Sequence, residues 1–182
     1  MKFFGNASLT PTSTTTIGDT IKSAYVSATQ GYTVPQRSIA IKIHANITGA
    51  ATQSTLAKCA IYNFNGKALV PYAITEEKTI SAALGFIYSF YFPKPPILRS
   101  DGQYFLSIWG NVVAGENASV RINANDIKTA TALAYAASWP GTLLVEIGIF
   151  NAPCIQCEYL EGDLVNNLKI QDSYLGGYQL MH

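Results

Sequence analysis

Charge is scarce in this 182-residue chain: Asp, Glu, Lys and Arg together make up 13% of it, against about 25% in an ordinary soluble domain. The 12 Lys and Arg side chains nearly balance the 11 Asp and Glu side chains, leaving a formal net charge of +1. Such a chain lacks the excess of positive charge by which proteins hold nucleic-acid phosphates or anionic membrane surfaces. We therefore expect no nucleic-acid partner.

Long apolar runs are also missing. The most apolar stretch, residues 143–150, is short and contains Glu146, whereas a membrane-spanning helix needs about 20 apolar residues. Residues 1–8 turn polar directly after two phenylalanines, so they lack the apolar core of a signal peptide. The sequence predicts neither a signal peptide nor a membrane span. A trimmed extracellular domain and a cytoplasmically assembled virion component both fit, so the predicted localisation is a virion or an extracellular surface.

Cysteine is rare too, with three residues at Cys59, Cys154 and Cys157, too few for a disulfide framework. Cys154 and Cys157 have the CxxC spacing of zinc and redox sites. Zinc needs four ligands, and the further soft candidates are only Cys59, His44 and His182. A redox CxxC opens a helix in a βαβ unit, which this strand-rich sequence does not predict. We expect free thiols, no metal site and no cofactor, with some disulfide as the alternative.

Strand signals, in contrast, are abundant. Residues 39–47 alternate so that Ile39, Ile41, Ile43, Ala45 and Ile47 share one face and Lys42, His44 and Asn46 share the other. This pattern predicts a strand with one buried and one wet face. About seven or eight such short strands, separated by turns such as Asn65-Gly66, predict an all-β fold. We expect an antiparallel, jelly-roll-like two-sheet sandwich with an extended C-terminal tail.

The composition changes near the C-terminus, where acidic residues are concentrated and leucines are irregularly spaced. We therefore predict a sandwich domain with an N-terminal arm over residues 1–153 and a tail over residues 154–182. The tail either folds back on its own domain or docks onto a neighbour. The candidate assembly residues in it are Leu160, Leu164, Leu168 and Ile170.

Several short motifs follow one another along residues 4–150. They include Lys58-Cys59-Ala60-Ile61-Tyr62, Thr75-Glu76-Glu77, the aromatic strand ending at Phe92-Pro93, and residues 98–106 leading to Trp109. This succession resembles a β-sandwich module that recurs in bacterial and archaeal surface proteins and in phage or virus structural proteins. The resemblance implies a turn at Gly102. It implies buried positions at Ala60, Ile61, Phe90, Phe92, Tyr104, Leu106 and Trp109.

Groups suited to catalysis are few. Glu76 and Glu77 are adjacent, so on a strand they point to opposite faces and cannot act together on one substrate. His44 lies on the wet face of its strand, and a nucleophile triad would need a serine and an acid beside it. The sequence contains no nucleophile elbow and no phosphate-binding loop. We expect no catalytic residues and no enzymatic activity.

Exposed aromatic rings are the usual platform for sugars in β-sandwiches, because the CH face of a pyranose packs on a ring. Alternation within residues 86–92 directs the phenylalanines into the core and Tyr91 outward. Trp139 precedes Pro140-Gly141 and so is expected in a loop. Tyr91 and Trp139 are therefore the candidate sugar-binding residues.

The sequence supports two hypotheses of function. The leading one is a non-enzymatic structural subunit of a virion, tail or surface assembly, self-associating as a homo-oligomer through sandwich edges and terminal segments. Low charge and a surface rich in Ser, Thr and Ala suit a subunit that buries much of itself against copies. The alternative is a lectin-like, carbohydrate-binding adhesion module, whose partner is a glycan. The resemblance implies an adhesive, carbohydrate-binding or structural role and does not choose among them.

Overall fold

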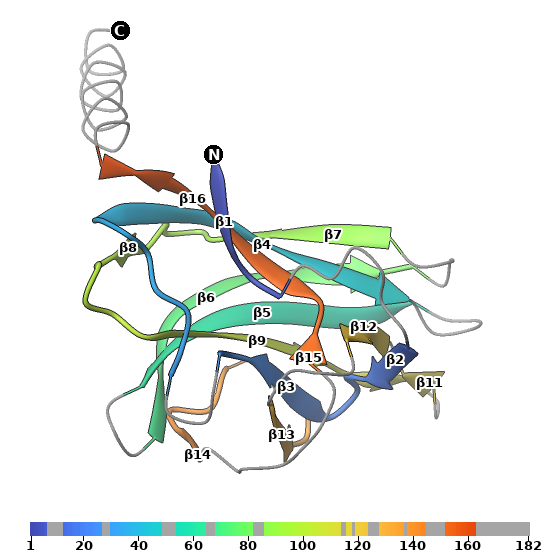
Figure 1. Cartoon of the computed structure of the whole chain (residues 1–182). Coiled ribbons are helices and arrows are strands. Elements are labelled where there is room, and N and C mark those ends of the chain that lie inside the picture. The colour runs from blue at the N-terminus through green and yellow to red at the C-terminus, as the bar shows by residue number, and fades with distance from the viewer. Residues whose placement is uncertain are drawn as a thin grey trace, which may run out of the picture.

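The computed structural model describes residues 1–6, 13–26, 30–48, 54–64, 68–81, 86–113, 116–117, 119–123, 128–136, 138–144 and 152–162. These residues form two antiparallel sheets that pack against each other (Figure 1). The predicted all-β, two-sheet sandwich is thereby confirmed. Within the described part of the chain, no helix has the length and apolar character needed to cross a membrane.

The eight-stranded sheet is built around β4 (Ser38–Thr48). On one side β4 pairs with β16 (Ile155–Glu161), and β16 pairs in turn with β1 (Lys2–Gly5). On its other side β4 pairs with β7 (Phe86–Tyr91) and β8 (Ile97–Leu98). Its C-terminal end pairs with β12 (Ser119–Asn123), which also contacts β2 (Ser13–Thr16) and β15 (Ala152–Pro153).

The six-stranded sheet faces the first. Its strands, in spatial order, are β13 (Lys128–Ala132), β3 (Thr20–Ala24), β9 (Tyr104–Gly110), β5 (Thr55–Phe64), β6 (Ala68–Ile80) and β14 (Leu143–Leu144). A separate pair joins β10 (Val112–Val113) to β11 (Glu116–Asn117). The order of the six-stranded sheet places the fully buried β9 at its centre.

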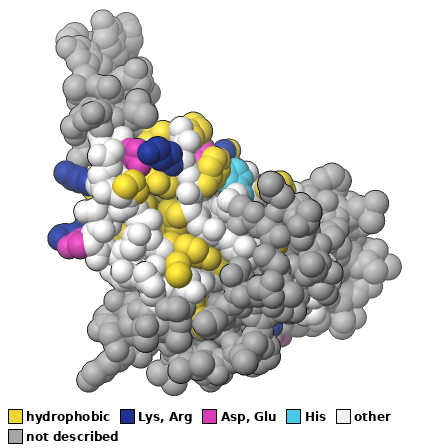
Figure 2. All heavy atoms as spheres, in the orientation of Figure 1, with side chains coloured by type: hydrophobic (Ala, Val, Ile, Leu, Met, Phe, Trp, Pro, Cys, Tyr) yellow, Lys and Arg dark blue, Asp and Glu magenta, His cyan; other side chains and the backbone are white. Residues whose placement is uncertain are grey.

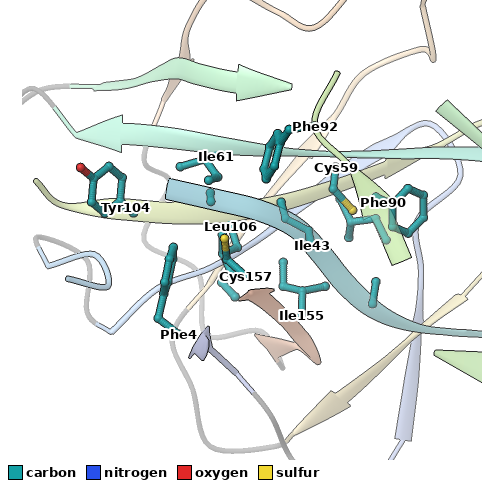
Figure 3. Close-up of a cluster of buried hydrophobic side chains, with 14 of the residues drawn as sticks. Phe4, Ile43, Cys59, Ile61, Phe90, Phe92, Tyr104, Leu106, Ile155 and Cys157 are labelled. Carbon is teal, nitrogen blue, oxygen red and sulfur yellow. The ribbon is translucent and has the colours of Figure 1, made fainter. Parts of the chain in front are cut away.

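The main core lies between the two sheets (Figure 3). Ile43 from β4, Leu106 from β9 and Ile155 from β16 meet there, and each is completely buried. All of the positions that the resemblance implied to be buried are buried: Ala60, Ile61, Phe90, Phe92, Tyr104, Leu106 and Trp109. The turn at Gly102 is also present, because its N–H donates to the carbonyl oxygen of Arg99 at 3.1 Å.

One detail of β4 differs from the alternation. The register of β4 against β16 shifts where Glu158 pairs with Lys42 and Tyr159 pairs with Ala40, which leaves Ile41 as an extra residue. A bulge of this kind reverses the faces of the residues on either side of it. Ala40 is therefore buried while Ile39 is half-buried. The prediction that Ile39 shares the face of Ile43 is therefore wrong, and Ile41 lies in the bulge itself.

A second core covers the far face of the six-stranded sheet. Trp109 and Tyr62 are buried there under a segment that contains Tyr135 and Trp139. One backbone bond and one side-chain bond hold this segment: the Leu133 N–H donates to the carbonyl oxygen of Asp19, and the Trp109 indole Nε1–H donates to the carbonyl oxygen of Leu133. Both faces of this sheet are therefore packed, whereas no described segment covers the outer face of the eight-stranded sheet.

The predicted boundary after residue 153 needs correction. Strand β16 begins at Ile155 and inserts between β1 and β4, with Ile155 and Cys157 completely buried. Residues 155–161 thus belong to the sandwich and not to a tail. Leu160 lies in this strand, half-buried. The other candidate assembly residues, Leu164, Leu168 and Ile170, lie outside the described residues.

We predict that truncation before β16 destroys the fold. A chain ending at Pro153 loses the strand that joins β1 to β4 and three buried core side chains, so it should show no cooperative thermal unfolding by circular dichroism. A chain ending at Gly162 keeps every described strand. It should melt within about 4 °C of the full chain, a shift that corresponds to about 1 kcal/mol at this size. A cooperative transition in the shorter chain would show that β16 is dispensable.

Candidate functional site

The outer face of the eight-stranded sheet brings together residues from both ends of the chain. The register places Phe3 of β1, Glu158 of β16, Lys42 of β4 and Tyr91 of β7 in one row across four strands. Strands in a sheet are spaced about 4.8 Å apart, so such neighbours can interact directly. We call the surface of this row and the adjoining residues on these strands the outer face.

A hydrogen-bonded chain crosses the outer face beside that row. His44 Nε2 lies 2.8 Å from Glu158 Oε2, and His44 Nδ1 lies 3.0 Å from Ser89 Oγ. A carboxylate only accepts, so Nε2–H donates to Glu158, and in the neutral imidazole Nδ1 accepts from the Ser89 hydroxyl. The chain links β16, β4 and β7. The sequence did not predict a serine and an acid beside His44, because Glu158 is 114 positions away along the chain.

Glu158 is an acid buried in this sheet, with only 4% of its surface exposed. Burial alone raises the pKa of its carboxyl, but the hydrogen bond from His44 and the charge of Lys42, 3.4 Å away, outweigh burial and lower the pKa overall. Its second oxygen, Oε1, is buried without a hydrogen-bond partner. The acid therefore depends on His44 and Lys42 for its ionised state.

The order serine, histidine, acid is that of a nucleophile, its base and an orienting group. Acyl transfer also needs N–H donors aimed at the oxygen that becomes negative. Ser89 lies within β7, in the hydrogen-bonded ladder with β4, and its own carbonyl oxygen accepts from Lys78 Nζ at 2.7 Å. We interpret the hydrogen bonds among Ser89, His44 and Glu158 as a polar network that fixes the register of three strands.

The edge of β7 that pairs with no described strand is capped by side chains from β6 of the other sheet. Lys78 Nζ donates to the carbonyl oxygen of Ser89, and the N–H of Tyr91 donates to Glu76 Oε1 at 3.4 Å. Lys78 and Glu76 also form an ion pair with each other at 3.6 Å. An added strand would need these same backbone groups, so side chains protect this part of the edge against strand addition. Glu77 points elsewhere, to the hydroxyl of Tyr135, which confirms that the two adjacent acids face apart.

The two predicted sugar-binding residues have opposite environments. Tyr91 is 47% exposed on the outer face, as predicted, with Lys42 Nζ 5.2 Å and Lys78 Nζ 5.8 Å from the centre of its ring. Trp139 is only 7% exposed, and its ring packs against those of Trp109 and Tyr62. The expectation of an exposed ring at Trp139 is wrong, because its segment covers the six-stranded sheet.

Two further apolar side chains are exposed on the same face as Tyr91. Phe3 on β1 is 50% exposed and Ile87 on β7 is 70% exposed. The Phe3 ring lies 5.9 Å from that of His44, centre to centre. In the view of Figure 2, hydrophobic patches at the surface lie beside charged side chains and a histidine. Alternation within residues 86–92 assigns Ile87 to the face of Tyr91, so the sequence contained the signal for it.

Cys59, Cys154 and Cys157 are buried, and none of the three forms a disulfide. Burial raises the pKa of the Cys59 and Cys157 thiols, which keeps both protonated and poorly nucleophilic. Within the described ranges, no three His, Cys, Asp or Glu side chains gather as metal ligands. His44, one of the zinc candidates, is instead bonded to Glu158 and Ser89.

Comparison of the chain with protein-family models, with curated proteins and with solved structures gave no match. The resemblance to the recurrent surface-protein and virion module therefore stays a prediction. Function has to be argued from the geometry of this chain alone.

We predict that Glu158→Gln lowers the free energy of unfolding by about 1.5–3 kcal/mol at pH 7, the usual worth of hydrogen bonds to a charged group. The folded-state pKa of Glu158 lies below its ordinary 4.5. The stabilisation is therefore complete above about pH 4.5 and is lost as the pH falls through the folded-state pKa. Urea unfolding across pH 2–7 should show a weaker acid dependence in the variant.

The matched control is Glu161→Gln on the same strand. Its ion pair with Lys2, at 2.7 Å, is largely exposed on the lysine side, and exposed pairs contribute at most about 1 kcal/mol. Equal losses in the two variants, with the same dependence on pH, would contradict a special role for Glu158.

Proposed function

We propose that this chain is a non-enzymatic structural subunit that associates with copies of itself through the outer face, as part of a virion or cell-surface assembly. The observation that carries the proposal is the exposure of three large apolar side chains on that face: Phe3, Ile87 and Tyr91. A sheet with one packed face usually presents polar residues on the other. Three large apolar side chains on one solvent-exposed sheet face favour a contact with another protein surface.

A second copy of the chain is the occupant that this face suits. Apolar side chains lie at both ends of the row, Phe3 at the β1 end and Tyr91 at the β7 end. Charges of both signs accompany the β7 end, where Lys78 pairs with Glu76. A two-fold axis can set the apolar β1 end of one copy against the apolar β7 end of the other, so that both ends are buried at once.

The sequence hypothesis placed self-association at sandwich edges and terminal segments. The capping of β7 by Lys78 and Glu76 disfavours strand addition there, so we assign the contact to the sheet face. The C-terminal segment with Leu164, Leu168 and Ile170 stays a second candidate contact, outside the described residues. A sugar-binding platform made of Tyr91 and Trp139 has no support, because Trp139 is buried and offers no second exposed ring.

We predict that Ile87→Glu weakens self-association of the full chain at least tenfold, because it buries a charge in the proposed interface. The measurement is the concentration dependence of mass by light scattering or sedimentation. Val26→Glu is the matched control. Val26 is 52% exposed and lies two residues after the end of β3, a strand of the other sheet. We expect that variant to associate as the wild type does. A wild-type chain that is monomeric at every concentration would refute the proposal, and so would equal effects of the two variants.

A further inference from the structure

A groove with a different chemistry lies at the side chain of Tyr72 on β6. Two adjacent cavities of about 590 and 550 Å³ share Tyr72 and Ile97 in their walls. Arg37, Arg99 and Asp101 line the first, and the proline-rich segment 93–96 lines the second. Each volume is within the usual range of ligand pockets, about 300–1,000 Å³. None of the side chains on which we base self-association lines this groove.

The ring of Tyr72 is accessible and held in place. It is 39% exposed. Its hydroxyl donates to the carbonyl oxygen of Ile97, and its ring packs on that of Tyr104 with 5.7 Å between centres. A ring that is fixed in this way loses little conformational entropy when a ligand stacks on it. Neighbouring Ile74, at 41% exposed, extends the apolar wall into the second cavity.

The polar wall of the groove is equally well organised. Arg99 and Asp101 form two parallel bonds, Nε to Oδ1 and Nη2 to Oδ2, each of 2.9 Å. The hydroxyl of Tyr104 anchors their turn by accepting from the Arg99 N–H at 2.5 Å and donating to its carbonyl oxygen at 3.2 Å. Gly102 is required in this turn, because a Cβ there would overlap the Tyr104 ring. The groove therefore presents its charged groups from a rigid base.

The charges in the groove favour an anion. Asp101 neutralises Arg99, whereas neither Arg37 nor Lys94 forms an ion pair with any acid that the structure describes. A guanidinium pairs with a carboxylate through two parallel hydrogen bonds. Both carboxylate oxygens of Asp101 already accept from Arg99, but each keeps a further lone pair that can accept from a hydroxyl group. An aromatic ring, a free guanidinium and a hydroxyl acceptor around one cavity match a sugar that carries a carboxylate.

We propose that this groove binds an acidic saccharide, with a pyranose face stacked on Tyr72 and its carboxylate on Arg37. The hydroxyls of the sugar donate to Asp101. The second cavity, beside residues 93–96, takes the next sugar of the chain, and Lys94 attracts its negative charge. This site is separate from Tyr91 and Trp139, and the proposal does not depend on self-association of the protein.

The experiment is titration calorimetry of the full chain with two matched probes, a β-1,4-linked tetrasaccharide of glucuronic acid and cellotetraose. The probes differ only by carboxylate against hydroxymethyl on each ring. We expect the acidic probe to bind at least tenfold more tightly. Arg37→Gln should reduce that preference and leave only the part that Lys94 contributes, and Tyr72→Ala should weaken binding of the acidic probe at least tenfold. Tyr91→Ala, on the outer face, should leave binding unchanged.

Tyr72→Phe covers the case in which Tyr72→Ala fails to fold. It keeps the ring and loses only the bond to Ile97, so it should still bind the acidic probe. No saturable binding of either probe at millimolar concentration would overturn the proposal. Binding that is equal in the wild type, Arg37→Gln and Tyr72→Ala would do the same. Loss of binding in Tyr91→Ala alone would move the sugar site to the outer face.

Discussion

The insertion of β16 between β1 and β4 is the contact on which the rest of the eight-stranded sheet depends. It ties the N-terminal strand to a strand near the end of the chain, because β1 has its sheet partner in β16. It also completes the core, since Ile155 and Cys157 fill the space opposite Leu106 of the other sheet (Figure 3). Such a long-range pairing forms only after the loop-closure entropy of the intervening chain is overcome. Among the described strands, the one nearest the C-terminus therefore completes the sandwich.

The same insertion brings an acid into the sheet, and the acid shapes the outer face. A buried carboxylate is tolerated only with close partners, and Glu158 has His44 and Lys42 on the adjacent strand. Ser89 extends this polar centre to β7. Polar interactions are thus largely satisfied within the middle of the face, whereas its ends at Phe3 and Tyr91 stay apolar and exposed. Association there would bury apolar area without breaking the central network.

Local patterns predicted what depends on local sequence. Alternation identified β4 and the outward Tyr91, and the motif order identified core positions from Ala60 to Trp109. The predictions that failed concern residues whose environment is set by contacts with parts of the chain far away in sequence. Trp139 has the sequence context of a loop residue, but Asp19 and Trp109 hold its segment over the six-stranded sheet. Glu158 was one of the four acidic residues whose concentration near the C-terminus predicted a tail. Its partners Lys42 and His44 are remote in sequence, so the sequence did not indicate that this acid belongs to a sheet. No periodicity reveals the bulge at Ile41, which the pairing with β16 creates.

The outer face and the Tyr72 groove use different side chains, and this separation has a consequence for binding strength. Copies that associate through Phe3, Ile87 and Tyr91 would each retain the groove side chains Arg37 and Tyr72. A saccharide polymer repeats the same ligand, so an oligomer that reaches two repeats at once gains a high effective concentration at its second site. A single groove of moderate affinity would then suffice for firm attachment. Self-association and sugar binding, which the sequence posed as alternatives, are compatible in one molecule on these physical grounds.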